Sequence, residues 1–124
     1  LDSFSIEDQI KMLDLVLARS ENEKQIDYDL LVDAYLSNSP PLILKTDQKV
    51  TKNIVSDSMW NHIESKLLIE RNKLFFEIIL EVEKDNKLFI AVGASHLSGE
   101  NGLLNQFKSA GYKMKPLNPF VRSA

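Results

Sequence analysis

Cysteine is absent from this sequence, which excludes disulfides, thiolate nucleophiles and cysteine-ligated zinc. Basic residues do not dominate either: 15 basic and 18 acidic side chains give a net charge of −3, so nucleic acid is not an expected partner. No apolar run approaches the roughly 18 residues that a membrane span requires, so no span is expected. The first residue is Leu1 rather than methionine, and we expect the chain to be processed or to be part of a longer protein.

Glycine is scarce, and the four glycines all lie between residues 93 and 111. Backbone freedom is therefore concentrated in one stretch, as expected where a loop approaches a ligand closely. The hydrophobic fraction of 44% is ordinary for a folded protein and suits one globular domain or part of one.

Apolar residues recur at helical spacing over the first two thirds of the chain. The expected helices cover residues 5–19, 26–35 and 56–83, with a short one beginning at residue 42. The longest of them is expected to bend or break near residues 70–72. Polar residues 20–25 and 46–51 are predicted to be loops, and the consecutive Pro40 and Pro41 are expected to stop the second helix.

The last third of the chain predicts a strand, a helix and a second strand. Residues 87–92 are nearly all apolar and are typical of a buried strand, residues 99–110 of a helix, and residues 112–117 alternate. This order predicts a right-handed βαβ unit with parallel strands. The expected fold class is therefore α/β, with a helical region over residues 1–55 followed by the long helix and the βαβ unit over residues 56–124.

Two strands do not form a stable sheet by themselves. Further strands would have to come from a segment before Leu1 or from a second copy of the chain. Exposed strand edges favour pairing between chains, so we expect a homodimer or a strand-swapped assembly.

His96 is the first candidate for chemistry, because it directly follows the predicted strand. A histidine there could be a metal ligand, a general base or an anion-binding group. The alternative is a loop histidine bonded to backbone, and spacing alone favours this alternative because no ligand set accompanies it. Ser95 and Ser98 lie outside a Gly-x-Ser-x-Gly elbow, so a serine nucleophile is not expected. Glu100 lies near a helix N-terminus, where the helix dipole stabilises a carboxylate.

Arg71 and Asn72 form the second candidate. An arginine that faces a cleft offers a fixed fork of donors for a carboxylate or phosphate. The alternative is a solvated helix residue paired with Glu70 or Glu77, and the pattern alone favours that alternative.

Several short motifs of this chain, in their order and spacing, resemble the TraB/PrgY/GumN family. The motifs are Gly-Ala-Ser-His-Leu-Ser-Gly at 93–99, Gly-Leu-Leu at 102–104, Gly-Tyr at 111–112, Arg-Asn at 71–72, and Leu1-Asp2-Ser3 with Gln9. Asp2 stands where the family usually has glutamate, which leaves the role of that carboxylate open.

The resemblance implies a larger α/β domain like that of erythromycin esterase and ChaN, built from two related halves. This chain would be the C-terminal half, and its partner would be the N-terminal half that precedes Leu1. The animal Tiki proteins of this family are described as metal-dependent proteases that cleave Wnt proteins, and bacterial relatives are often exported.

The proposed active centre of the family uses two Gly-x-x-His motifs with acidic and arginine residues. Carried over to this chain, His96 is a candidate ligand of a divalent Mn, Co or Zn ion, and Arg71 is a candidate for stabilising an oxyanion or a substrate carboxylate. The supporting residues implied are Asn72, Gly93, Ser95, Gly99, Glu100 and Gly102.

The sequence leaves two functions open. The first is half of the active site of a metal-dependent, peptidase-like hydrolase with a peptide substrate, inactive and weakly metal-binding when alone. The second is a non-catalytic module that captures a peptide or small anionic ligand at the same crevice.

Overall fold

The computed structural model describes residues 4–117 and is helical, with no β-strand in that range. The elements in chain order are α1 (Ile6–Leu17), α2 (Glu21–Leu36), α3 (Pro40–Ile54), α4 (Asp57–Ile63), the π-helical segment η1 (Glu64–Ile69), α5 (Glu70–Glu83), the 3-10 turn η2 (Ala94–His96) and α6 (Leu103–Ser109). None of the helices within these residues is long and apolar enough to cross a membrane.

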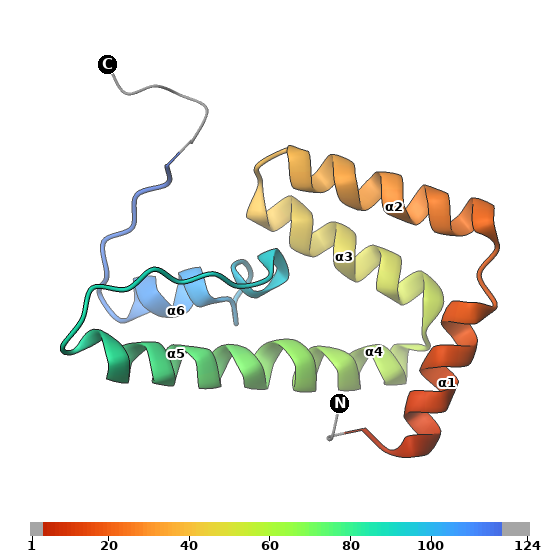
Figure 1. Ribbon diagram of the computed structural model, residues 1–124, viewed down its shortest axis with the longest axis horizontal. Coiled ribbons are helices and arrows are strands. Elements are labelled where there is room, and N and C mark those ends of the chain that lie inside the picture. The colour runs from red at the N-terminus through yellow and green to blue at the C-terminus, as the bar shows by residue number, and fades with distance from the viewer. Residues whose placement is uncertain (1–3, 118–124) are drawn as a thin grey trace.

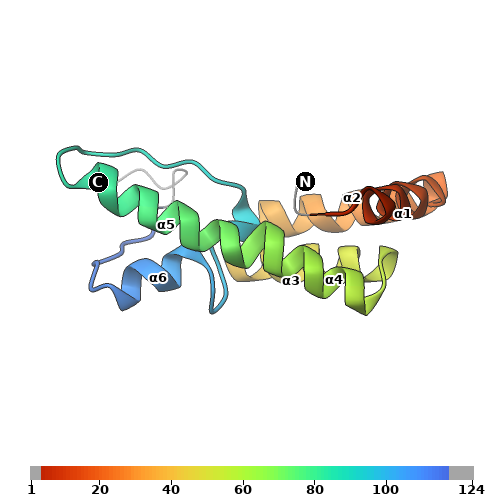
Figure 2. The same ribbon diagram turned by 90° about the horizontal axis from the view of Figure 1, so that it is seen from below.

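One long helical rod runs along the bottom of Figure 1, and the hairpin of α2 and α3 lies above it. α4, η1 and α5 follow one another as a continuous helix, so the expected break near residues 70–72 is instead a π-helical segment just before them. α2 and α3 form a packed hairpin, and η2 contacts α3. α6 lies beside α5 at one end of the molecule, and α1 lies at the opposite end in both views (Figures 1 and 2).

Serine side chains start the first four helices. Ser5, Ser20, Ser39 and Ser56 each accept a hydrogen bond from the backbone N–H three residues on. This satisfies one of the N–H groups that a helix start leaves without a partner within the helix. At Ser20 the Glu23 side chain also accepts from the Ser20 backbone N–H, which completes a capping box.

These caps correct two of the sequence predictions. The predicted loop 20–25 is wrong, because the capping box starts α2 at Glu21. The predicted loop 46–51 is also wrong, because α3 runs through it from Pro40 to Ile54. The prolines occupy the first two positions of α3, where their missing N–H groups have no helical partner to lose. They therefore begin a helix in addition to separating it from α2.

The predicted α/β fold class with a C-terminal βαβ unit is wrong for the described residues. Residues 86–93 and 112–117 are non-helical connections without any strand pairing. An extended segment becomes a strand only when a neighbour takes up its backbone hydrogen bonds. The apolar run was expected to be buried, yet Phe89 is 96% exposed. Between these segments the helix is shorter than predicted, since it begins only at Leu103.

The buried apolar residues lie between helices. They are Phe4, Ala34, Val50, Trp60 and Leu103. Aromatic rings continue this core from α5 to α6: Phe76 and Phe107 meet edge-on at 5.0 Å, and Phe107 meets Tyr112 at 5.2 Å. Gly111 follows α6 with φ +90°, as expected for the residue that ends a helix.

Candidate functional site

His96 closes the 3-10 turn η2, at the end of the connection that follows α5. Its backbone N–H donates to the carbonyl oxygen of Gly93 at 3.0 Å, which forms the turn. The imidazole is half-buried and lies against α5 through an edge-on contact with Phe75, with the ring centroids 5.2 Å apart.

Asn72 is the buried polar residue at the centre of the site, and its side chain is only 3% exposed. Its amide nitrogen Nδ2 donates to the carbonyl oxygen of Asn101 at 2.9 Å. Its amide oxygen Oδ1 therefore faces Nδ1 of His96, at 2.6 Å. Because an amide oxygen only accepts hydrogen bonds, Nδ1 must carry the proton. In the neutral imidazole the lone pair then lies on Nε2.

The charge state of His96 is shifted towards the neutral form. Burial lowers the pKa of His96 below its usual 6.5, and the positive charge of Arg71 lowers this pKa further. Arg71 is exposed on α5, and its guanidinium carbon lies 5.5 Å from the centroid of the Phe75 ring. The ring of Phe75 therefore contacts both the guanidinium of Arg71 and the imidazole of His96. At neutral pH His96 is a neutral base whose lone pair lies on Nε2.

Asp47 of α3 also anchors the turn η2, through a hydrogen bond. The hydroxyl of Ser95 donates to Oδ2 of Asp47 at 2.8 Å, which joins the turn to α3. Asp47 was missed in the sequence because residues 46–51 were predicted to be a loop. Because this segment is a helix, Asp47 lies one turn before the buried Val50 and therefore on the same side of α3. That spacing is the signal by which the sequence could have identified Asp47 as an inward-facing residue.

The glycines shape the turn between η2 and α6. A Cβ atom on Gly102 would lie 2.2 Å from the carbonyl oxygen of Ser98 and 2.5 Å from that of Leu97, so a side chain has no room there. Gly99 has φ +88°, a conformation that side chains disfavour. The N–H of Leu104 donates to the carbonyl of Leu97 at 3.0 Å and closes the loop. Gly93, by contrast, has only ordinary contacts around its Cβ position.

The structure brings together most of the predicted site residues. A hydrogen bond joins Asn72 to His96, and another joins Ser95 to α3. Arg71 is connected to the first pair only through its cation–π contact with the ring of Phe75. Glu100 is exposed in the turn before α6 and belongs to no such set. Within residues 4–117, no group of three or more histidine or acidic side chains is arranged to hold a metal ion.

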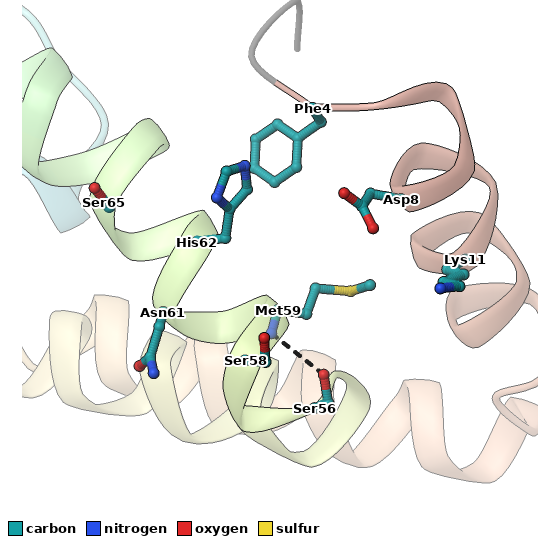
Figure 3. A pocket seen from close by; sticks show the side chains of 9 residues that line it. All are labelled: Phe4, Asp8, Lys11, Ser56, Ser58, Met59, Asn61, His62 and Ser65. Carbon is teal, nitrogen blue, oxygen red and sulfur yellow. Dashed lines mark hydrogen bonds between the residues drawn. The ribbon is translucent and has the colours of Figure 1, made fainter.

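Three cavities border the turn that carries His96. The smallest, of about 90 Å³, lies against Asn72, Ser95 and the glycine turn. The other two, of about 250 and 400 Å³, are both lined by Leu97. A further cavity, of about 560 Å³, lies away from this turn, between α1 and α4 (Figure 3). Neither Arg71 nor His96 lines any of these four cavities, so the candidate site is an arrangement around His96 outside them.

The sequence model of the TraB/PrgY/gumN family matches residues 1–116. No curated protein and no solved structure matches the chain.

Proposed function

The chain belongs to the TraB/PrgY/gumN family, and from that membership we propose that it supplies part of the active site of a metal-dependent, peptidase-like hydrolase. His96 is the proposed metal ligand, and Arg71 is the proposed contact for a substrate carboxylate or a developing oxyanion. The chain would be the C-terminal half of a Tiki-like domain, because it contains a single Gly-x-x-His motif, at residues 93–96.

The observation that carries this proposal is the hydrogen bond between Asn72 and His96. Histidines that bind metals are usually oriented by a hydrogen bond from the second ring nitrogen to a fixed acceptor. Here that acceptor is buried and is itself fixed by the Asn101 carbonyl. The depressed pKa of His96 keeps Nε2 free for a ligand bond at neutral pH.

The residues fit a metal as one part of a ligand set. A catalytic zinc-type site takes about three protein ligands plus water. Among the described residues His96 offers one oriented ligand, and the others would come from the N-terminal half of the domain. A bound divalent cation would supply Lewis acidity and an activated water. The side chains of this chain hold His96 in one tautomer and present the cation of Arg71 beside it.

The test is a titration of the chain with Zn²⁺, followed by nitrogen NMR of the imidazoles. We expect weak binding that shifts Nε2 of His96, while Nδ1 keeps its proton. Asn72→Ala should weaken this binding about tenfold or more, because the ring loses its orienting partner. Asn53→Ala, an exposed asparagine of α3, is the matched control and should change nothing. Binding through Nδ1, or equal binding by Asn72→Ala, would refute the proposed role of His96.

A second function is favoured by the exposure of Arg71. Its guanidinium is open to solvent and stands next to a neutral imidazole, which suits capture of a peptide carboxylate without any metal. Titration with N-acetylalanine separates the two functions. A binding module is favoured over a hydrolase by two results together. The NMR signals of Arg71 change on adding N-acetylalanine without Zn²⁺, and the signals of His96 do not shift when Zn²⁺ is added.

A further inference from the structure

α1 carries an apolar stripe that faces solvent along its whole length. Ile6, Ile10, Leu13 and Leu17 are 76%, 54%, 57% and 66% exposed. Their spacings of four, three and four residues place them on one face of the helix, as in the seam of a coiled coil. No residue of α1 is buried.

The side of α1 that faces the rest of the molecule carries two polar residues and one methionine. The half-buried residues of this helix are Asp8, Gln9, Met12. Figure 3 shows Asp8 directed into the cavity opposite Met59 of α4. A surface helix normally turns its apolar stripe towards the core, so the orientation of α1 is the reverse of the usual one.

Contacts at both ends hold α1 in this orientation. At its start Phe4 is buried, and its ring meets that of His62 edge-on at 4.5 Å. The side chain of Gln9 also donates to the carbonyl oxygen of Phe4, at 3.0 Å. Beyond its end Arg19, largely buried, forms an ion pair with Asp27 of α2. The outward stripe is therefore a fixed feature of the fold.

Acidic side chains border one flank of the stripe, and one of them, Glu7, also pairs with Lys11 at 3.2 Å. Glu7 and Asp14 each follow a stripe residue and lie seven residues apart, so they share one flank of the helix. Residues 5–37, which contain α1 and α2, carry eight acidic and three basic side chains, a net charge of −5, against −3 for the whole chain. This end of the molecule is thus more acidic than the rest.

We propose that the outer face of α1 is the docking site for an amphipathic helix of a partner protein that carries lysine or arginine beside its own apolar stripe. Flanking charges set the choice of partner between paired helices, and an acidic flank selects a basic one. The same charges disfavour the other occupants. A second copy in antiparallel orientation would place acidic flank against acidic flank, and an anionic membrane surface would be repelled.

The experiment uses the full chain and synthetic helical peptides followed by fluorescence anisotropy. One peptide has leucine at the four-three spacing with lysine on both flanks, a second has glutamate on the flanks, and a third has the lysine composition in scrambled order. We expect saturable binding of the first alone, with the second weaker by about tenfold or more. High salt should weaken the binding of the lysine peptide.

Leu13→Gln tests the stripe, and Leu15→Gln is its matched control. Leu15 lies on another side of α1 and is 39% exposed. We expect Leu13→Gln to weaken the lysine peptide by about tenfold and Leu15→Gln to change it by less than about twofold. Neither side chain is buried, so both variants should keep the wild-type circular dichroism spectrum and unfolding curve.

Three results would overturn the proposal. Equal affinity for the lysine and glutamate peptides would show that charge does not select the partner. Equal losses in Leu13→Gln and Leu15→Gln, or no saturable binding at all, would show that the stripe is not the docking face. Dimerisation of the wild-type chain that Leu13→Gln abolishes in analytical ultracentrifugation would assign the face to a second copy instead.

Discussion

Replacing Asn72 with alanine would remove the two hydrogen bonds at the centre of the candidate site. The amide of Asn72 donates to the Asn101 carbonyl at 2.9 Å and accepts from Nδ1 of His96 at 2.6 Å. The Asn101 carbonyl keeps a second donor, Nε2 of Gln106 at 3.1 Å, so it is not left without a partner. The Nδ1–H group of His96, however, loses its acceptor in a half-buried place.

The expected loss of stability follows from these contacts. Each hydrogen bond contributes about 1 kcal/mol net to folding. Alanine is the better helix former in the middle of α5 and returns about 0.5 kcal/mol. The net loss in the free energy of unfolding is therefore about 1–2 kcal/mol, which lowers the melting temperature by about 3–10 °C for a chain of this size.

Urea unfolding and imidazole nitrogen NMR together check this reasoning. In the wild-type chain His96 should be a single tautomer with its proton on Nδ1, and in Asn72→Ala both tautomers should be populated. Asn53→Ala, the exposed control, should retain wild-type stability and the wild-type His96 spectrum. A wild-type His96 with its proton on Nε2, or an unchanged tautomer in Asn72→Ala, would show that Asn72 does not orient the ring.

Three further predictions concern the same site. Gly102→Ala should destabilise the chain by about 2 kcal/mol or more, because its Cβ would meet two backbone carbonyl oxygens, whereas Gly93→Ala should be nearly neutral in the same denaturation assay. The free energy of unfolding should fall as the pH drops below 6.5, because the unfolded chain protonates His96 first, and should level off below the lowered folded pKa; a His96→Gln chain should lack this part of the slope. Arg71→Gln should raise the pKa of His96 slightly in an NMR titration, with the difference shrinking in high salt, whereas Lys73→Gln, two residues further along α5, should leave this pKa unchanged.

Helical periodicity predicted most of the helices because each has its own local signals. The pattern at residues 5–19 became α1, and that at residues 26–35 lies inside α2. The pattern failed where polar residues continue a helix, since α3 turns polar side chains outward over residues that resemble a loop. It failed again at residues 87–92, because apolar composition does not state whether a neighbouring strand is present to pair with.

The candidate site was found by its residues but not by its geometry. Arg71 was a candidate for facing a cleft with Asn72 in support, although the pattern alone favoured a solvated arginine, and the structure shows Arg71 exposed and Asn72 buried. Neighbouring positions on a helix point about 100° apart, so only one of the two can face inward. The half-buried Phe76 and Ile79 lie four and seven residues after Asn72 on its own face. That spacing in the sequence already favoured Asn72 as the inward residue.

The choice of asparagine at position 72 follows from what its two neighbours require. The Asn101 carbonyl needs a donor, and the Nδ1–H group of His96 needs an acceptor. Aspartate could serve only the imidazole and would set a negative charge against the carbonyl oxygen. That charge would also favour the imidazolium form of His96 and raise its pKa, so a ligand at Nε2 would compete with a proton up to a higher pH. Leucine would fill the space and satisfy neither neighbour. An amide is thus the side chain that keeps His96 both oriented and neutral, and those two conditions are what a ligand bond at Nε2 demands.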